Sequence, residues 1–255
     1  MLRSRITPCL LVRDRGLVKT KNFKPFKYIG DPMNAVRIFN EKKVDELIVL
    51  DIDATSKGLS PDFTMIKKIA AECRMPLCYG GGIKTVAHAE HIVSLGVEKI
   101  AISSSFISNP NLVTDISLKI GSQSVVVVLD VKKNIFGKYE VYTHNGTART
   151  KNTPLELAKL AVKLGAGEIV INSIDLDGAM SGYDLVLAKN LRDVVKVPIS
   201  ILGGAGSFND MRSLINVCGV IGAVAGSLFV FKGALQAVLI NYPSNTEKDS
   251  LLENH

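Results

Sequence analysis

Two glycine-rich turns in matching positions are the residues of this sequence best suited to chemistry. Gly81 and Gly82 follow one short apolar run, and Gly203 and Gly204 follow another. Glycine lets backbone N–H groups approach an anion closely, and the start of a following helix adds partial positive charge. Each turn is therefore predicted to bind a phosphate group.

The apolar run after each turn ends in small residues that could contact the same phosphate. These are Ser103 and Ser104 in the first case, and Gly226 and Ser227 in the second. A single Gly-Gly turn is weak support, because glycine also serves tight turns. Two matched copies favour one elongated substrate with a phosphate at each end, and the net charge of +7 fits an anionic ligand.

The duplication extends through the elements that must position these turns. An offset of 122 positions carries Pro76 onto Pro198 and residues 46–49 onto 168–171. This period is too long for a solenoid, so the repeated unit is half a domain.

Eight short, continuous apolar runs alternate with amphipathic segments of helical length. Continuous runs are typical of parallel strands that are covered on both faces. Eight such units predict a TIM (β/α)8 barrel built from two similar half-barrels, and a doubly wound open sheet is the alternative. The predicted strands span residues 6–12, 46–52, 76–79, 99–103, 124–131, 168–174, 198–202 and 221–225.

Helix signals support this organisation. Asp31 with Pro32, and Thr153 with Pro154, are predicted to begin helices over residues 33–43 and 155–164. No linker rich in proline, glycine or serine divides the halves. Residues 1–242 are therefore predicted to form a single barrel, followed by a polar C-terminal tail over residues 243–255.

Composition excludes several classes of function. The basic residues are scattered and only 6% of residues are aromatic, which argues against nucleic-acid binding. A charged start and the lack of an 18-residue apolar run predict neither a secretion signal nor a membrane span. Four cysteines without metal-ligand spacing are typical of reduced thiols, so we expect a cytoplasmic protein without a metal site.

The barrel prediction locates the remaining candidates. Loops after the strand C-terminal ends form the active face of such barrels. The basic segment 13–24 follows the first strand and reads most simply as a solvated loop, although Lys19 within it could close over a substrate. Asp177, after the sixth strand, could bind substrate hydroxyls or make an Asx-turn. His88 and His91 lack a carboxylate partner in sequence and are expected to face solvent.

These motifs resemble those of the cyclase subunit of imidazole glycerol phosphate synthase, over roughly residues 1–240. The resemblance implies a barrel that takes ammonia from a separate glutaminase subunit and needs no cofactor. It also implies a lyase reaction of histidine biosynthesis, which converts a bis-phosphorylated ribulosyl aminoimidazole-carboxamide to imidazole glycerol phosphate and an aminoimidazole ribotide. The matching motifs are RITPCL (5–10), VK (18–19), NF (22–23), GDP (30–32), DEL (45–47), LDI (50–52), GGGI (80–83), GSQ (121–123), SIDLDG (173–178), SGYD (181–184) and GGAG (203–206).

The resemblance also implies a pair of catalytic aspartates at the ends of strands 1 and 5. Asp130 is present at strand 5, but superposing the half-repeats places Leu11 at the equivalent position of strand 1. Leucine can neither donate nor accept a proton. One interpretation is a cyclase that works with one carboxylate, and Asp53 on strand 2, where the family has threonine, could replace the other.

The second interpretation is a paralogue on another route. It would conduct ammonia from a glutaminase to a sugar amidotransferase of surface-polysaccharide biosynthesis. The family's asparagine at the strand 4 phosphate site is Ser103 here, a further departure. An interaction subunit without chemistry of its own and a related phosphoribosyl isomerase remain alternatives.

Four charged residues stand at strand starts, at the opposite end of the predicted barrel. Arg5, Glu46, Lys99 and Glu168 precede strands 1, 2, 4 and 6, and their charges alternate in sign. Such ion pairs are common for stability alone. In the family resembled, the matching residues form a gate through which ammonia enters, so the same role is expected here.

Overall fold

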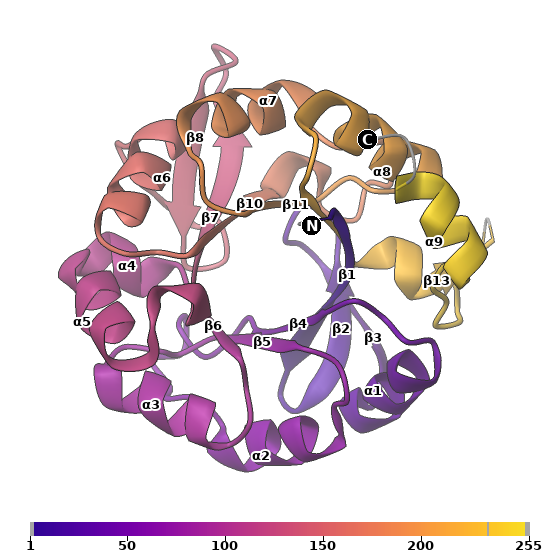
Figure 1. Cartoon of the computed structure of the whole chain (residues 1–255), viewed down its shortest axis with the longest axis horizontal. Helices are drawn as coiled ribbons and strands as arrows, with labels where there is room; N and C mark the ends of the chain where they lie inside the picture. The colour runs from indigo at the N-terminus through magenta and orange to yellow at the C-terminus, as the bar shows by residue number, and fades with distance from the viewer. Residues whose placement is uncertain (1–2, 234, 253–255) are drawn as a thin grey trace.

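Eight parallel strands close into a ring in the computed structural model, which describes residues 3–233 and 235–252 (Figure 1). The barrel strands are β1 (Arg5–Arg13), β4 (Leu47–Asp51), β5 (Leu77–Gly80), β6 (Lys99–Ile102), β7 (Val125–Lys133), β10 (Glu168–Ser173), β11 (Ile199–Leu202) and β12 (Gly222–Ala225). Each pairs in parallel with its neighbours, and β1 joins β12 to β4, which closes the ring. The predicted (β/α)8 barrel is confirmed, with every strand boundary within two residues of its predicted place.

Helices form the outer layer around this ring (Figure 1). They are α1 (Pro32–Glu41), α2 (Phe63–Glu72), α3 (Val86–Ser94), α4 (Ser104–Ser108), α5 (Asn111–Ile120), α6 (Pro154–Lys163), α7 (Leu185–Val194), α8 (Phe208–Cys218) and α9 (Asn245–Leu252), with short 3-10 turns η1 (Ser122–Ser124), η2 (Ile174–Leu176) and η3 (Ser227–Phe229). The helix predicted over residues 33–43 ends at Glu41. Beyond it, Lys43 takes a left-handed conformation with φ of 52°, which an α-helix cannot include.

The half-barrel repeat extends to the residues that begin the helices. Three pairs of N-caps stand 122 positions apart, and each cap side chain accepts a backbone N–H from the first turn of its helix. A cap of this kind typically contributes about 0.5–2 kcal/mol. The pairs are Asp31 and Thr153, Asp62 and Asp184, and Thr85 and Ser207.

Additional antiparallel strands follow β1 and β7 at the mouth of the barrel. They are β2 (Gly16–Thr20), β3 (Phe26–Gly30), β8 (Tyr139–Thr143) and β9 (Ala148–Arg149), and a separate hairpin joins β13 (Phe231–Lys232) to β14 (Ala237–Val238). The solvated-loop interpretation of residues 13–24 is therefore wrong for β2. Because β1 runs beyond the rim, β2 pairs with it and buries Val18 and Lys19.

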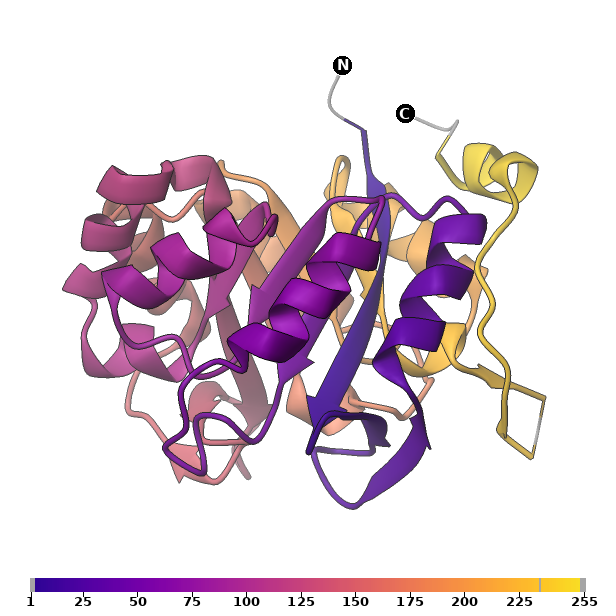
Figure 2. The same cartoon turned by 90° about the horizontal axis from the view of Figure 1, so that it is seen from below.

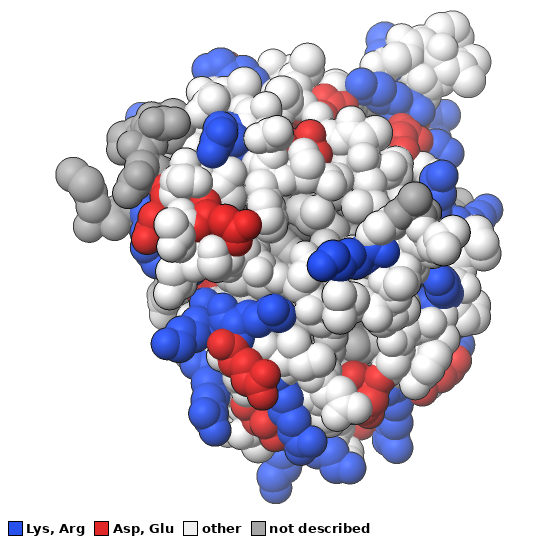
Figure 3. All heavy atoms as spheres, turned by 90° about the vertical axis from the view of Figure 1, so that its right-hand side faces the viewer, with Lys and Arg blue, Asp and Glu red and all other residues white. Residues whose placement is uncertain are grey.

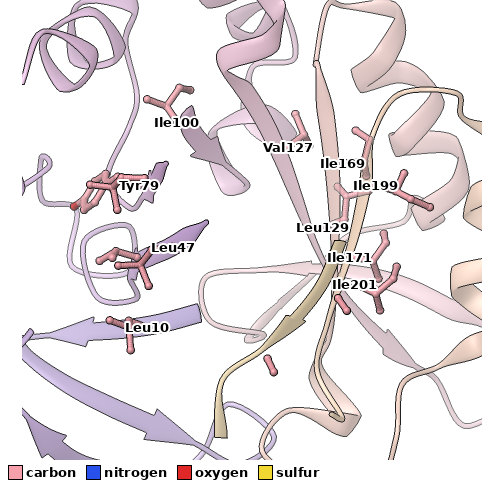
Figure 4. Packing of buried hydrophobic residues seen from close by; sticks show 14 of the residues in the cluster. Leu10, Leu47, Tyr79, Ile100, Val127, Leu129, Ile169, Ile171, Ile199 and Ile201 are labelled. Atoms are coloured by element: carbon pink, nitrogen blue, oxygen red, sulfur yellow. The ribbon is translucent and has the colours of Figure 1, made fainter. Parts of the chain in front are cut away.

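Barrel strands send alternate side chains outward and inward, as the period of an extended strand requires. Outward side chains pack with the helices in the main core, and Figure 4 labels ten of them, among them Leu10, Leu129 and Ile171. A smaller cluster made only of strand residues fills the interior of the ring. Leu11 packs against this inner cluster, so it faces into the barrel.

The molecule has two distinct ends. In Figure 2 the strand arrowheads point down, toward the face that carries the hairpins, and α9 lies at the upper side with the strand starts. Residues 243–255, predicted as a polar tail, thus include a helix, within which Lys248 and Leu251 are buried. No helix among residues 3–233 and 235–252 is long and apolar enough to cross a membrane.

Charged side chains of both signs are spread over the surface. On the side shown in Figure 3, lysines and arginines lie among acidic and uncharged residues. The surface there is mixed in charge, in keeping with the scattered basic residues of the sequence.

Candidate active site

A cavity of about 290 Å³ opens at the C-terminal ends of the strands, and all eight barrel strands contribute to its wall. Its size is close to the lower limit of ordinary small-molecule sites. The structure brings every predicted catalytic and substrate-binding residue to this wall: Lys19, Gly81, Gly82, Ser103, Ser104, Asp130, Asp177, Gly203, Gly204, Gly226 and Ser227.

Asp130 projects into the cavity from the end of β7. Its Oδ1 accepts a hydrogen bond of 2.9 Å from Asn172 Nδ2. Burial raises the pKa of Asp130 to about 7, although the Asn172 hydrogen bond opposes the shift; the nearby charge of Asp177 adds to it. A carboxyl group that titrates near neutral pH can both take and return a proton.

Asn172, at the end of β10, is a cavity residue that the sequence analysis did not single out. Its side chain is buried, and its Oδ1 has no hydrogen-bond partner among the described residues. A buried amide oxygen of this kind is suited to accept an N–H or O–H group of a ligand. The one available signal was a polar residue at the end of the apolar run over residues 169–171.

The two half-barrels differ where these side chains meet the cavity. Asp130 lies beside Asn172 in the β7–β10 ladder, and the equivalent pair in the β1–β4 ladder is Leu11 beside Leu50. All four residues line the cavity. The Asp130–Asn172 pair therefore includes a group that can exchange a proton, and the equivalent Leu11–Leu50 pair is apolar.

Asp53 does not take the place of the missing carboxylate. It is buried but is not part of the cavity wall. Its Oδ2 lies 2.7 Å from Lys57 Nζ and 3.1 Å from Arg13 Nε, so two cations already neutralise it. This contradicts the hypothesis of Asp53 as a substitute. Asp51 does line the cavity, and its Oδ1 accepts N–H groups from residues 53 and 54 at 3.0 Å.

Lys19 reaches the cavity with its amino group buried, rather than as part of a solvated loop. Its Nζ donates a hydrogen bond of 2.6 Å to the carbonyl oxygen of Cys9. Burial lowers the pKa of Lys19, and nearby Asp177 opposes that shift. A Cβ at residue 226 would lie 2.5 Å from Lys19 Nζ, so Gly226 leaves the room that the ammonium group occupies.

Asp177 holds the end of β2 and the segment after it instead of making an Asx-turn in its own loop. Its Oδ2 accepts hydrogen bonds from Thr20 Oγ1 at 2.5 Å and from the backbone N–H of Phe23 at 3.2 Å. Because Thr20 and Phe23 also line the cavity, Asp177 positions one part of its wall.

The two glycine turns have equivalent geometry. Gly81 and Gly203 both have positive φ, at 123° and 95°. A Cβ on Gly81 would lie 2.5 Å from the carbonyl oxygen of Asp51, and one on Gly203 would lie 2.7 Å from that of Ser173. Close packing therefore requires glycine here whether or not phosphate binds. The second glycine of each turn is also left-handed, with φ of 72° at Gly82 and 107° at Gly204.

The serines of the phosphate-binding prediction occupy equivalent places too. Ser104 begins α4 directly after β6, and Ser227 begins η3 directly after β12. Ser103 and Gly226 precede them as the capping residues. Each glycine turn is thus accompanied by a helical turn that starts at the same rim of the cavity.

The four charged residues meet at the other end of the barrel in a ring of ion pairs. Lys99 Nζ lies 2.7 Å from Glu46 Oε1 and 2.8 Å from Glu168 Oε2. Arg5 completes the ring, at 3.0 Å from Glu46 and 2.6 Å from Glu168. Burial opposes ionisation of Glu168, but Arg5 and Lys99 outweigh it and lower the pKa of Glu168. Ser200 Oγ donates to the same carboxylate at 2.7 Å, a contact not anticipated from sequence.

Apolar side chains fill the barrel between this ring and the cavity. They are Cys9, Ile48, Cys78, Ala101, Val126, Val128, Val170, Leu202 and Val224. His88 and His91 lie elsewhere, on α3, where His91 is exposed and stacks on Phe63 with ring centroids 4.3 Å apart.

The fold and the site together define a (β/α)8 barrel made of two similar halves, with its active face at the strand C-terminal ends. Within this class, the chain belongs to the histidine biosynthesis protein family, whose model matches residues 5–236.

Its relatives carry related names. A protein of Vibrio vulnificus (strain YJ016), provisionally named imidazole glycerol phosphate synthase subunit hisF3, is 55% identical over 254 residues, which cover 99% of this chain and 98% of the relative. A provisionally named HisF subunit of Leptospira interrogans is 54% identical, over 98% of this chain and 99% of its own. A protein of Alkaliphilus metalliredigens (strain QYMF), named imidazole glycerol phosphate synthase subunit HisF without qualification, is 39% identical, over 90% of this chain and 91% of its own.

Proposed function

We propose that this chain is the ammonia-using cyclase subunit of an imidazole-glycerol-phosphate-synthase-type glutamine amidotransferase. Its reaction would convert a bis-phosphorylated ribulosyl aminoimidazole-carboxamide to imidazole glycerol phosphate and an aminoimidazole ribotide, in the cytoplasm and in histidine biosynthesis. The names of its relatives support this activity.

One observation carries the proposal: a single cavity joins Asp130 and Lys19 to both glycine turns. A substrate with a phosphate at each end would place one phosphate at Gly81 and Ser104 and the other at Gly203 and Ser227. Its central carbons would then lie over the mouth, within reach of residues on the strand ends.

Asp130 would carry the proton transfers of the reaction. Ammonia adds to a carbonyl carbon, one product is eliminated and a ring closes, so protons have to be removed and delivered in sequence. A carboxyl with a pKa of about 7 suits both tasks. Asn172 would hold its orientation through their 2.9 Å hydrogen bond, and Lys19 would stabilise negative charge that develops nearby.

Ammonia would come from a glutaminase subunit bound in a heterodimer at the strand-start face. The ring of Arg5, Glu46, Lys99 and Glu168 lies at the centre of that face and would form the entrance. Co-purification with the glutaminase of the same source should give a one-to-one complex with raised glutaminase activity. Persistent monomers at micromolar concentration, without activation, would count against any amidotransferase role.

Leu11 favours a second candidate, in which the chain activates a glutaminase and passes ammonia to a separate sugar amidotransferase of surface-polysaccharide biosynthesis. Neither Leu11 nor Leu50, the residue that it pairs with, can exchange a proton, whereas the equivalent pair includes Asp130. The relatives from Vibrio vulnificus and Leptospira interrogans, at 55% and 54% identity, carry provisional names, whereas the Alkaliphilus metalliredigens relative, named HisF without qualification, is 39% identical.

Turnover with supplied ammonium salts separates the two candidates, because it removes the need for a glutaminase. The cyclase proposal expects slow formation of imidazole glycerol phosphate from the bis-phosphorylated substrate, abolished by Asp130→Asn. Binding of the substrate without any product, together with activation of the glutaminase, would support the conduit instead.

A further inference from the structure

The ladder between β1 and β4 does not reach the strand-start end of the barrel. Its first pair is Cys9 with Ile48, so the backbone groups of Ile6 on that side have no strand partner. The N–H of Ile6 instead donates to Asp45 Oδ2 at 3.1 Å, and its carbonyl oxygen accepts from Tyr242 Oη at 2.7 Å. Two side chains thus satisfy buried backbone groups that the sheet leaves open.

The segment that follows the barrel supplies the rest of this network. Lys248 Nζ, on α9, lies 2.7 Å from Asp45 Oδ1, and the two side chains are only 8% and 9% exposed. Tyr242 Oη also accepts the backbone N–H of Asp45 at 3.3 Å. The Tyr242 ring packs against Phe229 with centroids 5.3 Å apart, and Leu251 buries the far end of α9.

The two residues held in this way directly neighbour two members of the charged ring. Ile6 follows Arg5, and Asp45 precedes Glu46. Arg5 Nη1 and Glu46 Oε2 form the 3.0 Å contact of the ring that joins β1 to β4. The network therefore links the two backbones on which this contact depends, at the end of the barrel where no ladder bond links them.

We propose that residues 242–251 form a clamp that positions the charged ring. Tyr242 and Lys248 act as positioning residues: they fix Ile6 and Asp45, and through them the separation of Arg5 from Glu46. The clamp itself does not depend on the proposed function. Only its consequence rests on that function: ammonia from a bound glutaminase passes through a ring whose geometry the clamp fixes.

Local hydrogen exchange tests the clamp without any assay of activity. In Lys248→Met and in Tyr242→Phe, the Ile6 and Asp45 amides should exchange at least ~10-fold faster, as expected when a local hydrogen bond is lost. The Ile169 amide serves as internal control, because it donates to the Pro198 carbonyl across the same end of the barrel. Asp249→Asn, which neutralises an exposed residue of the same helix, should change none of the three rates.

The ratio of glutamine-driven to ammonium-driven turnover gives a second readout. A C-terminal segment that only stabilised the fold would not change this ratio. In the glutaminase complex, Lys248→Met should lower glutamine-driven turnover about 3- to 10-fold relative to ammonium-driven turnover, less than the ~100-fold that a 1 Å misplacement at a reacting centre can cost. Lys248→Arg keeps the buried charge, so its ratio of glutamine-driven to ammonium-driven turnover should equal that of the wild type.

Three outcomes are informative. Unchanged exchange at Ile6 and Asp45, with Arg5 and Glu46 still in contact in a crystal structure of Lys248→Met, would overturn the clamp. Faster exchange that spreads equally to Ile169 would reduce it to general stabilisation and also overturn it. If Glu46→Gln leaves the turnover ratio unchanged, the ammonia entrance of the proposed function fails, while the exchange rates still decide on the clamp.

Discussion

Leu11 and Asp130 occupy equivalent positions in the two half-barrels, and only Asp130 can exchange a proton. Both face the cavity, so the difference lies in chemistry rather than in orientation. A reaction that needs an acid and a base on opposite sides of the substrate would be slow in this chain.

Leu11→Asp should raise ammonium-driven turnover about 10- to 1,000-fold, less than a full acid–base contribution because the surrounding residues are not arranged for a carboxylate. The measurement is product formation at saturating ammonium. Leu11→Asn introduces a polar side chain of the same size without the proton transfer and should give little gain. If the wild type already turns over as fast as an ordinary cyclase, Leu11 does not limit the reaction.

Asp130→Asn should stabilise the protein at high pH while it abolishes activity. A carboxyl whose folded pKa is raised destabilises the fold when it is ionised. This cost is absent below the unfolded pKa of about 3.9 and complete above about 7. Asparagine can still accept the Asn172 hydrogen bond, so we expect the Tm to rise by about 5 °C at pH 8.

At pH 3 the two proteins should melt at nearly the same temperature, because the wild-type carboxyl is then largely neutral in both states. If Asp130→Asn raised the Tm equally at both pH values, the Asp130 carboxyl would have an ordinary pKa in the folded protein.

The residues that the sequence analysis predicted for the site all line one cavity, and the duplication marks several of them twice. The glycine turns are found in this way, whereas Asp130 follows from the family resemblance, because its equivalent in the repeat is Leu11. Asn172 was missed because the equivalent residue is Leu50, so the repeat gives no polar match there. Lys19 was correctly placed in the segment after strand 1, but its burial was not predicted. The burial depends on the pairing of β2 with β1, and the charged neighbours of Lys19 indicated a solvated loop instead.

At the scale of elements, ion pairs anchor the β1–β2 hairpin to the loop after β4. Asp53 forms ion pairs with both Arg13 and Lys57, and Lys57 Nζ also lies 2.9 Å from Asp14 Oδ1. The Arg13 guanidinium lies 4.0 Å from the centroid of the Phe26 ring. Since Arg13 and Phe26 line the cavity, this network sets one wall of it.

Asp53→Asn should loosen this wall without removing an acid or a base. We expect the KM for the bis-phosphorylated substrate to rise about 3- to 10-fold with kcat within about twofold, because binding is lost equally from ground and transition states. The comparison variant is Lys189→Gln, which breaks an exposed ion pair with Asp193 on α7 and should change neither constant. A shifted pH profile of kcat would instead restore a catalytic role for Asp53.

The elements themselves follow from local signals that repeat. The barrel is predicted by helix caps, such as Asp31 and Thr153, and by continuous apolar runs. Both signals occur in each half of the sequence, so each half supports the prediction independently. The strands β2, β3, β8 and β9 escaped prediction because each has only two to five residues and none of them is a continuous apolar run. Only the extension of β1 and β7 beyond the rim makes them pair.

At the scale of the whole molecule, the equivalent turns lie on opposite sides of one mouth. Their glycines are required by close contacts with neighbouring strand ends, so glycine substitutions would confuse packing with binding. The serines at the starts of α4 and η3 are better probes of phosphate.

Ser227→Glu should weaken binding of the bis-phosphorylated ribotide about 10- to 100-fold through like-charge repulsion, and Ser104→Glu should do the same from the other side. Calorimetry of both variants, with circular dichroism to confirm folding, makes the comparison. A mono-phosphate should be weakened strongly by one variant and little by the other. If a mono-phosphate binds the wild type as tightly as the bis-phosphate, the substrate does not span both turns.

The bond between Tyr242 and Ile6 joins residues 236 positions apart, and β1 pairs on one edge with β12. During synthesis at about 5–20 residues per second, the first strand waits about 10–50 s for these partners. An apolar strand with an unpaired edge invites aggregation over that time. We expect ribosome-bound chains that end before β12 to be cut by trypsin at Arg13, and chains that include Tyr242 to resist. Equal resistance of both would mean that the nascent barrel protects its first strand by other means, before its last one exists.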